Sequence, residues 1–188
     1  DDIPSGERVM NCDERRAMRA FGRTTRGEFA RRHEASSHSN GATRGVKALV
    51  KTAAAPGFTL KNVPEPTIRD DEVLIRVKRA GVCGTDVHIY DWDAWAQGRV
   101  KPPLVIGHEF AGEVEQVGKL VTDVKEGDRV TAEGHIVDGR CLLCRTGNSH
   151  VCPHTKIIGV DRDGCFAEYI NMPATNVWHL DDDVSYDI

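Results

Sequence analysis

The chain has 188 residues, enough for one domain with a full hydrophobic core and part of a second. Its formal charge of -4 combines 25 basic and 29 acidic residues, which excludes the basic surfaces that bind nucleic acid or membranes. No apolar run approaches the roughly 18 residues needed to span a bilayer, and we find no secretion signal. We therefore predict a soluble, cytoplasmic protein that acts on small polar molecules, with no nucleic-acid or membrane partner.

Residues 1–45 differ in composition from the rest of the chain. They contain nine Arg, no Lys and seven acidic residues, a net charge of +2, whereas the remaining residues carry -6. Their apolar side chains are scattered, so they can bury little surface against the entropy cost of ordering. We predict a disordered or loosely helical extension outside the folded domain. A mitochondrial targeting peptide is the alternative, and the seven acidic residues argue against it.

The rest of the chain has a sequence pattern typical of β-strands, in which short apolar segments are separated by Gly, Pro and Asp turns. In residues 72–77 the apolar Val73, Ile75 and Val77 alternate, interrupted by Leu74, which predicts a half-buried strand. Many short strands at close spacing favour a barrel or a sandwich. The predicted strands lie within residues 46–51, 58–63, 72–82, 110–118, 128–134, 166–171 and 176–180.

A dense polar segment, GVCGTDVHIYDWDAW at residues 81–95, follows the third predicted strand. It places Cys83, Thr85, Asp86 and His88 within six positions. An isolated cysteine is most often a small buried hydrophobe, which is the alternative interpretation of Cys83. The neighbouring polar side chains favour a chemical role.

A second segment, VIGHEFAGEVEQVG at residues 105–118, contributes His108 and Glu109 between two strands. A lone histidine would usually be a satisfied core residue. Together, Cys83, His108 and Glu109 supply the sulfur, nitrogen and oxygen donors that zinc accepts, and three ligands leave one coordination position open for substrate or water. The sequence therefore indicates a catalytic zinc site.

A third segment, GHIVDGRCLLCRTGNSHVC at residues 134–152, has the spacing Asp-x2-Cys-x2-Cys-x7-Cys, which is typical of a metal site. Ferredoxin runs have a cysteine at each of the first three places, so an iron–sulfur cluster fits poorly. A redox pair formed by the first two cysteines leaves the other two side chains without a role. Zinc accepts a carboxylate as a ligand, so we predict a zinc site made by Asp138, Cys141, Cys144 and Cys152.

These motifs resemble the zinc-dependent medium-chain alcohol dehydrogenases, whose signature Gly-His-Glu-x2-Gly-x5-Gly occurs at residues 107–118. EGDRV, at residues 126–130, is similar to another element of that family. CGTDVHIYDWDAW, GEVEQVG, AEGHI and GCFAEY resemble the threonine-oxidising branch of the family. The resemblance runs from Val46 to the end of the chain. It implies a mainly β, GroES-like barrel that takes part in oxidising the secondary alcohol of L-threonine to 2-amino-3-oxobutanoate with NAD.

The resemblance also implies roles for single residues. Cys83, His108 and Glu109 would ligate the catalytic zinc, and Thr85 and His88 would form a proton relay. Zinc is a Lewis acid that lowers the pKa of a bound hydroxyl, so an alkoxide can form and its hydride can pass to NAD. Thr85 lies close to the ligand Cys83, and histidine titrates in the useful range. A helix cap is the alternative role for Thr85.

The remaining motif residues receive lesser roles. By the resemblance, the cluster from Asp138 to Cys152 is a structural zinc lobe remote from the chemistry. His135, in AEGHI, is a substrate-side candidate, with an ordinary surface-loop histidine as the alternative. We expect Asp86 and Trp92 to shape the pocket.

For domain organisation, we expect the extension at residues 1–45 and a GroES-like zinc-binding domain at 46–188. No Gly-x-Gly-x-x-Gly motif follows a strand, so we expect the Rossmann domain of the family to be absent from this chain, and the fragment alone to be inactive. The family forms tetramers, which implies a homotetramer for the full-length protein. The alternatives are a polyol or butanediol dehydrogenase, or a catalytically silent zinc-binding fragment.

Overall fold

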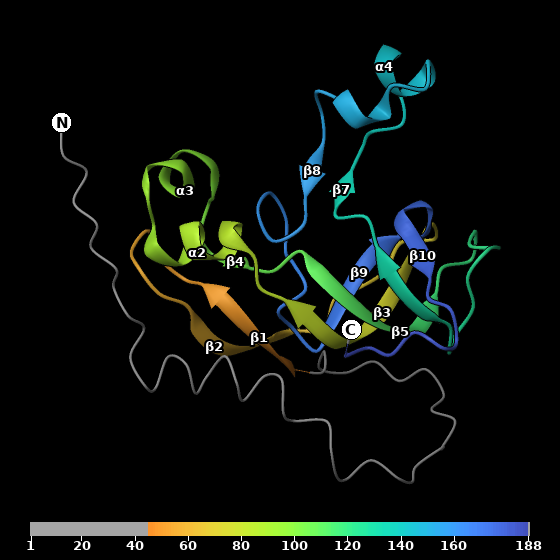
Figure 1. The fold of residues 1–188 in the computed structure, drawn as a ribbon, viewed down its shortest axis with the longest axis horizontal. Helices are drawn as coiled ribbons and strands as arrows, with labels where there is room; N and C mark the ends of the chain where they lie inside the picture. Colours follow the sequence, from red (N-terminus) through yellow and green to blue (C-terminus); the bar gives the residue numbers. More distant parts are fainter. Residues whose placement is uncertain (1–44, 188) are drawn as a thin grey trace, which may run out of the picture. The chain divides into compact units, whose positions relative to one another are not determined.

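The structure, a computed structural model, describes residues 45–187 (Figure 1). The predicted extension at residues 1–45 lies outside the described residues, apart from Gly45. The described chain forms two antiparallel sheets, a two-stranded ribbon and short helices, which confirms the prediction of a mainly β domain.

The smaller sheet has the strand order β2-β1-β4. Its central strand pairs with β2 at six of its seven residues, from Gly45 opposite Pro64 to Val50 opposite Thr59. The contact with β4 is short and covers two residue pairs. The bounds are β1 (Gly45–Lys51), β2 (Thr59–Pro64) and β4 (Leu104–Val105).

The larger sheet has the strand order β10-β6-β5-β3-β9, so β5 lies in its centre. Its longest pairing joins β3 and β5, with two register shifts. All of its neighbouring pairs are antiparallel. The bounds are β3 (Glu72–Gly81), β5 (Glu109–Val117), β6 (Arg129–Ala132), β9 (Tyr169–Pro173) and β10 (Val177–His179), the last preceded by the 3-10 turn η2 (Ala174–Asn176).

Backbone hydrogen bonds connect β1 with the segments that precede β9 and β5. Leu49 in β1 donates to the carbonyl of Phe166 over 2.8 Å, and Phe166 donates to the carbonyl of Ile106, also over 2.8 Å. All three side chains belong to one buried cluster with residues of β3, β5, β6 and β9. A single apolar core therefore holds both sheets together, as expected for a barrel.

The start of β3 differs from the half-buried strand that the sequence predicts. Val73 and Ile75 face the main core, but Leu74 on the opposite face is also buried. Val46 and Tyr169 cover Leu74 and form a second small cluster with it. Alternation failed here because other strands cover both faces, which the local pattern cannot reveal.

Each of the seven predicted strands has a counterpart in the structure, whereas the helices were not predicted. The helices α2 (Gly84–Asp91) and α3 (Ala94–Arg99) follow β3 directly (Figure 1). The backbone of Cys83 is extended, and its sulfur accepts the amide of Thr85 over 3.3 Å. The Asp86 carboxylate accepts the Cys83 amide over 3.0 Å, which completes a capping box.

A buried lysine holds the other end of α2. Lys51, in β1, is fully buried, and its ammonium donates to the carbonyls of Ile89 and Ala55, each over 2.6 Å. The carbonyls of Gly57 and Tyr90 lie slightly further away, at 3.4 and 3.3 Å. A cation at the C-terminal end of a helix complements the helix dipole. Lys51 therefore ties α2 to β1 and to the loop before β2.

The segment between the two strands of the ribbon forms a lobe that stands away from the sheets (Figure 1). It contains α4 (Leu142–Arg145) and the 3-10 turn η1 (Ser149–Val151), neither of which has a buried residue. Leu142 is 76% exposed and Val151 53% exposed. Apolar burial therefore does not account for the folding of this lobe. The ribbon consists of β7 (His135–Ile136) and β8 (Lys156–Ile157).

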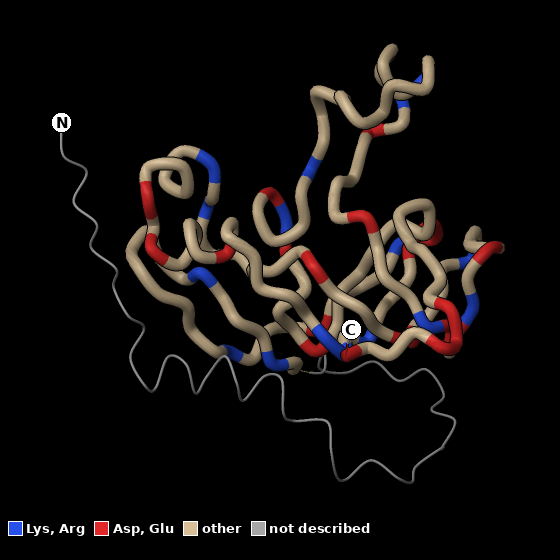
Figure 2. The backbone as a smooth tube through the Cα atoms, viewed as in Figure 1, with Lys and Arg blue, Asp and Glu red and all other residues tan. Residues whose placement is uncertain are grey.

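Acidic and basic positions are interspersed along the described backbone (Figure 2). On the larger sheet, for example, Glu113 in β5 pairs with Arg76 and Lys78 in β3, each over 3.1 Å. Within residues 45–187, none of the helices is long and apolar enough to cross a membrane.

Candidate metal centres and active site

The start of α2 and the start of β5 bring Cys83 and His108 together. The Cys83 sulfur lies 2.9 Å from Nε2 of His108. Both side chains are half-buried, and their ligand atoms lie with a carboxylate oxygen of Asp86 inside a group no wider than 4.8 Å. Residues 25 positions apart in the sequence therefore present sulfur, nitrogen and oxygen donors to one point.

Asp86 lies behind the histidine ring rather than in the pocket wall where we expected it. Its side chain is 2% exposed, and its Oδ1 is 3.6 Å from Nδ1 of His108. Burial raises the pKa of Asp86, against the opposing effects of the Cys83 amide and of His108. A carboxylate facing one ring nitrogen directs the other nitrogen towards a metal. Sequence reasoning missed this role. The Cys-x-x-Asp spacing could have indicated the capping box, but not the contact with His108, which lies 22 positions further along the chain.

Two buried polar atoms at this point have no hydrogen-bond partner in the described structure, Oδ1 of Asp86 and Nδ1 of His108. Leaving such atoms unsatisfied is costly unless another group completes the site. A metal held by His108 Nε2 would favour the tautomer with hydrogen on Nδ1, which could then donate to Asp86. The donors of Cys83 and His108 therefore fit zinc.

Glu109, the third predicted ligand, is exposed and is not part of the compact donor group. It lines the same cavity as His108. Its carboxylate lies over Gly81, where an added Cβ would be only 2.6 Å from Oε2. The structure therefore places Glu109 beside the predicted metal position without bringing its carboxylate into contact with Cys83.

Two glycines of the signature permit close packing around this site. Gly107 has φ +91°, a conformation that favours glycine, and an added Cβ would meet the ring of Phe166 at 2.2 Å. Gly112, in β5, lies so close to the neighbouring strand β3 that an added Cβ would be 2.4 Å from the carbonyl oxygen of Arg76. These glycines allow the chain to present His108 and then enter the centre of the sheet.

Thr85 and His88, the predicted relay residues, both lie on α2. Thr85 is half-buried, and Cys83 rather than Thr85 caps the helix. The side chain of His88 is 59% exposed, and its Nδ1 lies 2.6 Å from Oδ2 of Asp93. The proposed alternative for Thr85, a helix cap, is therefore wrong.

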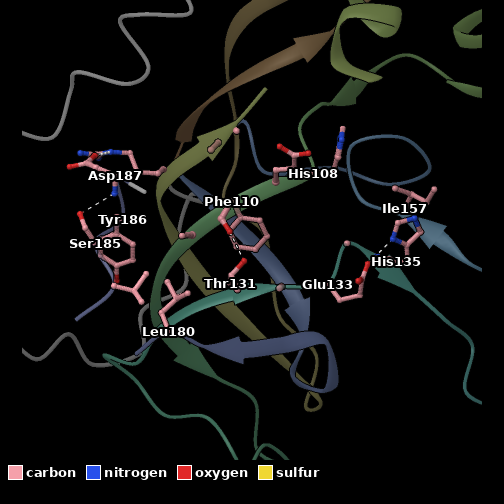
Figure 3. Close-up of a pocket in the computed structure, with 18 residues that line it drawn as sticks. His108, Phe110, Thr131, Glu133, His135, Ile157, Leu180, Ser185, Tyr186 and Asp187 are labelled. Atoms are coloured by element: carbon pink, nitrogen blue, oxygen red, sulfur yellow. Dashed lines mark hydrogen bonds and ion pairs between the residues drawn. The ribbon is translucent and has the colours of Figure 1, made fainter. Parts of the chain in front are cut away.

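A cavity of about 790 Å³ runs from His108 and Glu109 along the larger sheet. Phe110 and Thr131 line it, and His135 lies at one end (Figure 3). Nδ1 of His135 is 2.6 Å from Oε1 of Glu133, and the two side chains point towards one another (Figure 3). His135 therefore shares a cavity with the predicted zinc ligand His108, as a substrate-side residue would.

Trp92 does not line this cavity, in contrast to our expectation. It has φ 58°, ends α2 and packs against the main core. The Lys51 ammonium lies 4.8 Å from its ring centroid, a cation–π distance. Trp92 therefore links the end of α2 to Lys51 and to the main core.

The second donor cluster lies in the lobe. It consists of Asp138, Cys141, Cys144 and Cys152, whose ligand atoms all lie within 4.8 Å of one another. None of the five cysteines in the described part of the chain forms a disulfide, and the sulfurs of Cys141 and Cys152 are 3.9 Å apart. Three thiols and one carboxylate thus converge without covalent bonds between them.

The electrostatics of the lobe favour a bound cation. The amides of Cys141 and Arg140 hold the pKa of Asp138 well below its usual range, so a carboxylate stands among the thiols. Burial and the neighbouring sulfurs raise the pKa of Cys144 to about 12. A divalent cation would stabilise the thiolate form of Cys144, which this crowding disfavours. Because the lobe also lacks an apolar core, its donor set fits a structural zinc ion.

The profile of the alcohol dehydrogenase GroES-like domain matches residues 69–182, more than half of the chain. The chain therefore belongs to this family, which confirms the family and the GroES-like barrel that the motifs indicate. L-threonine 3-dehydrogenase of Bacillus licheniformis is 62% identical to it over 133 residues, which cover 71% of this chain and 38% of that enzyme.

Two solved structures are similar in fold. Galactitol-1-phosphate dehydrogenase from Escherichia coli is 30% identical, with a TM-score of 0.68 over 75% of this chain and 40% of that one. An alcohol dehydrogenase from Escherichia coli CFT073, solved with NADH, is 35% identical, with a TM-score of 0.66 over 76% of this chain and 40% of that one. The chain spans about two fifths of the length of the relatives that it matches.

Proposed function

We propose that this chain is the catalytic domain of a zinc- and NAD-dependent alcohol dehydrogenase that oxidises the C3 hydroxyl of L-threonine to 2-amino-3-oxobutanoate. The convergence of Cys83 and His108, with Asp86 behind the ring, is the observation that carries the proposal. The similarity to L-threonine 3-dehydrogenases, at 53 to 62% identity, supports the substrate. The complex of a relative with NADH supports the cofactor.

In this proposal Cys83, His108 and Glu109 hold the catalytic zinc. Zinc, when bound, supplies Lewis acidity that lowers the pKa of an alcohol. Thr85 accepts the proton of the substrate hydroxyl and passes it towards His88, which can exchange it with solvent because the ring is exposed. His135, held by Glu133, borders the substrate. The cavity that His108, Glu109 and His135 line is where the substrate would bind.

We further propose that Asp138, Cys141, Cys144 and Cys152 hold a structural zinc. Residues 1–45 form an extension to the GroES-like domain at 46–188, and a Rossmann domain belongs to the complete protein. That protein is a cytoplasmic homotetramer. A polyol dehydrogenase is the second candidate, favoured by the similarity to galactitol-1-phosphate dehydrogenase, but the lower identity of 30% ranks it second.

Metal analysis of the chain as it stands tests both sites without any assay of activity. We expect two zinc ions per chain after dialysis. Cys83→Ser and Cys144→Ser should each lower the content by about one ion, because each removes a thiolate ligand. Cys165→Ala is the matched control, since this buried cysteine belongs to neither donor group. Equal zinc content in all four proteins would refute both sites.

A chimera tests the reaction. Residues 46–188 would replace the matching part of the Bacillus licheniformis enzyme, which shares 62% of its residues with this chain. We expect NADH formation with L-threonine, and its loss in the Cys83→Ser chimera. A folded, zinc-loaded chimera that prefers galactitol 1-phosphate or 2,3-butanediol would favour the second candidate, and one that oxidises none of these would refute the reaction.

A further inference from the structure

Asp93 makes two separate hydrogen bonds, one with each carboxylate oxygen. Oδ1 accepts the amide of Ala96 over 2.9 Å and thereby caps α3. Oδ2 lies 2.6 Å from Nδ1 of His88 on α2. One side chain therefore starts a helix and holds the ring of the exposed histidine on the preceding helix.

The protonation of this pair follows from its surroundings. The Ala96 amide, followed by His88, holds the pKa of Asp93 below its usual value, so the carboxylate is ionised at neutral pH and can only accept hydrogen bonds. Nδ1 of His88 must then be the donor. In the neutral ring the other nitrogen, Nε2, is left as the acceptor. The ring of Trp95 also lies near His88, with 6.2 Å between the two ring centroids, and it carries no charge that could compete with Asp93.

We infer that Asp93 is a positioning residue that fixes His88 in the Nδ1–H tautomer, so that Nε2 is the atom that accepts the proton in the alcohol oxidation. The inference rests on the proposed function for the role of His88, but the tautomer itself does not depend on it. The proton leaves the hydroxyl oxygen of the substrate, L-threonine, and ends on Nε2 of His88. The hydrogen on Nδ1 of His88 stays bonded to Oδ2 of Asp93. Asp93 thereby stabilises the imidazolium without accepting the proton.

The short turn between α2 and α3 explains why this arrangement is stable. Trp92 ends α2 with φ 58° and packs on the Lys51 ammonium, which itself holds the carbonyls of Ile89 and Tyr90. The amide of Asp93 donates to the carbonyl of His88 over 3.4 Å. The backbone between the two side chains is therefore fixed at both ends, and the pair loses little further entropy on forming.

The test is the tautomer of His88 in the 15N-labelled chain, read from the nitrogen shifts of its ring near pH 8. The signals are assigned by their loss in His88→Gln. We expect the Nδ1–H form in the parent. Asp93→Asn keeps the oxygen that caps α3 but turns an NH2 group towards Nδ1, so the ring should switch to Nε2–H. Asp91→Asn, the same change two residues earlier on an exposed side chain, should leave the spectrum unchanged.

Asp93→Ser separates capping from ring orientation, because serine caps helices well but cannot reach His88 with a second oxygen. We expect native circular dichroism with loss of the Nδ1–H preference. In the chimera, Asp93→Asn should lower kcat for L-threonine by about 100-fold at unchanged KM. A parent ring in the Nε2–H form, or the same tautomer in the parent and in Asp93→Asn, would overturn the inference. An inactive parent chimera would instead refute the proposed function and leave the tautomer result standing.

Discussion

Gly112→Ala is the substitution whose cost can be worked out most directly from the structure. Gly112 lies in β5, the central strand of the larger sheet, opposite Val77 on one side and Val130 on the other. An added Cβ would lie 2.4 Å from the carbonyl oxygen of Arg76 and 2.8 Å from Cγ2 of Ile75. Since such contacts essentially never fall below 3.0 Å, the Arg76 carbonyl must move by at least 3.0 - 2.4 = 0.6 Å.

That carbonyl cannot move freely, because Arg76 is paired with Glu113 in β5 and with Tyr169 in β9. Overpacking of this kind costs about 1 to 3 kcal/mol, and a weakened ladder bond adds about 1 kcal/mol. The lower entropy of the unfolded alanine chain offsets at most about 1 kcal/mol. We therefore expect Gly112→Ala to lower the free energy of unfolding by about 1 to 4 kcal/mol, or Tm by roughly 3 to 13 °C.

Gly98→Ala is the matched control. Gly98 lies inside α3, and an added Cβ would have nothing within 4 Å. Alanine is the better helix former, so this variant should gain about 0.5 to 1 kcal/mol. Denaturant unfolding followed by circular dichroism on the zinc-loaded chains measures both. A Gly112→Ala midpoint equal to or above that of the parent would refute the reasoning, since the strands would then have room that the structure denies them.

Further predictions concern three side chains and the N-terminal extension. Burial lowers the pKa of Lys51 from 10.5 to about 8, so between pH 8 and 10.5 the unfolded chain binds more protons than the folded chain and stability rises with pH. Relative to Lys51→Met, the free energy of unfolding of the parent should increase by up to about 3 kcal/mol over this range. A difference between the two proteins that does not change with pH would show that the pKa of Lys51 is unperturbed. Asp138→Ala should lose about one zinc and expose the lobe to proteolysis, whereas Asp138→Cys should keep zinc; equal zinc retention by the alanine variant against a chelator would make Asp138 an ordinary turn residue. In the chimera, Thr85→Ala should keep both metals and lower turnover by about 100-fold, and full activity would refute the relay. Removal of residues 1–45 should change neither zinc content nor Tm; a loss of several degrees would show that the extension supports the domain.

Where the evidence was local, the sequence alone was enough to predict the arrangement. The donors from Asp138 to Cys152 lie within 15 consecutive positions, and a loop of that length can bring all four together without help from the rest of the chain. The strands were also predictable, because turn residues and apolar segments mark them directly. The signature glycines could be recognised, but the reason for Gly112 became visible only with the carbonyl of Arg76 beside it.

Contacts between distant segments depended on the tertiary structure. Leu74 is buried because Val46 and Tyr169 cover it, and Lys51 is buried because the end of α2 offers it carbonyl oxygens. Asp86 lies behind His108 because the helix α2, which strand periodicity did not predict, turns this side chain into the interior. Asp93 holds the exposed His88 because the turn between α2 and α3 brings the two side chains together. Local patterns restrict what a segment can form, but the partner of a buried polar group depends on which other segments pack against it, and only the folded chain determines that.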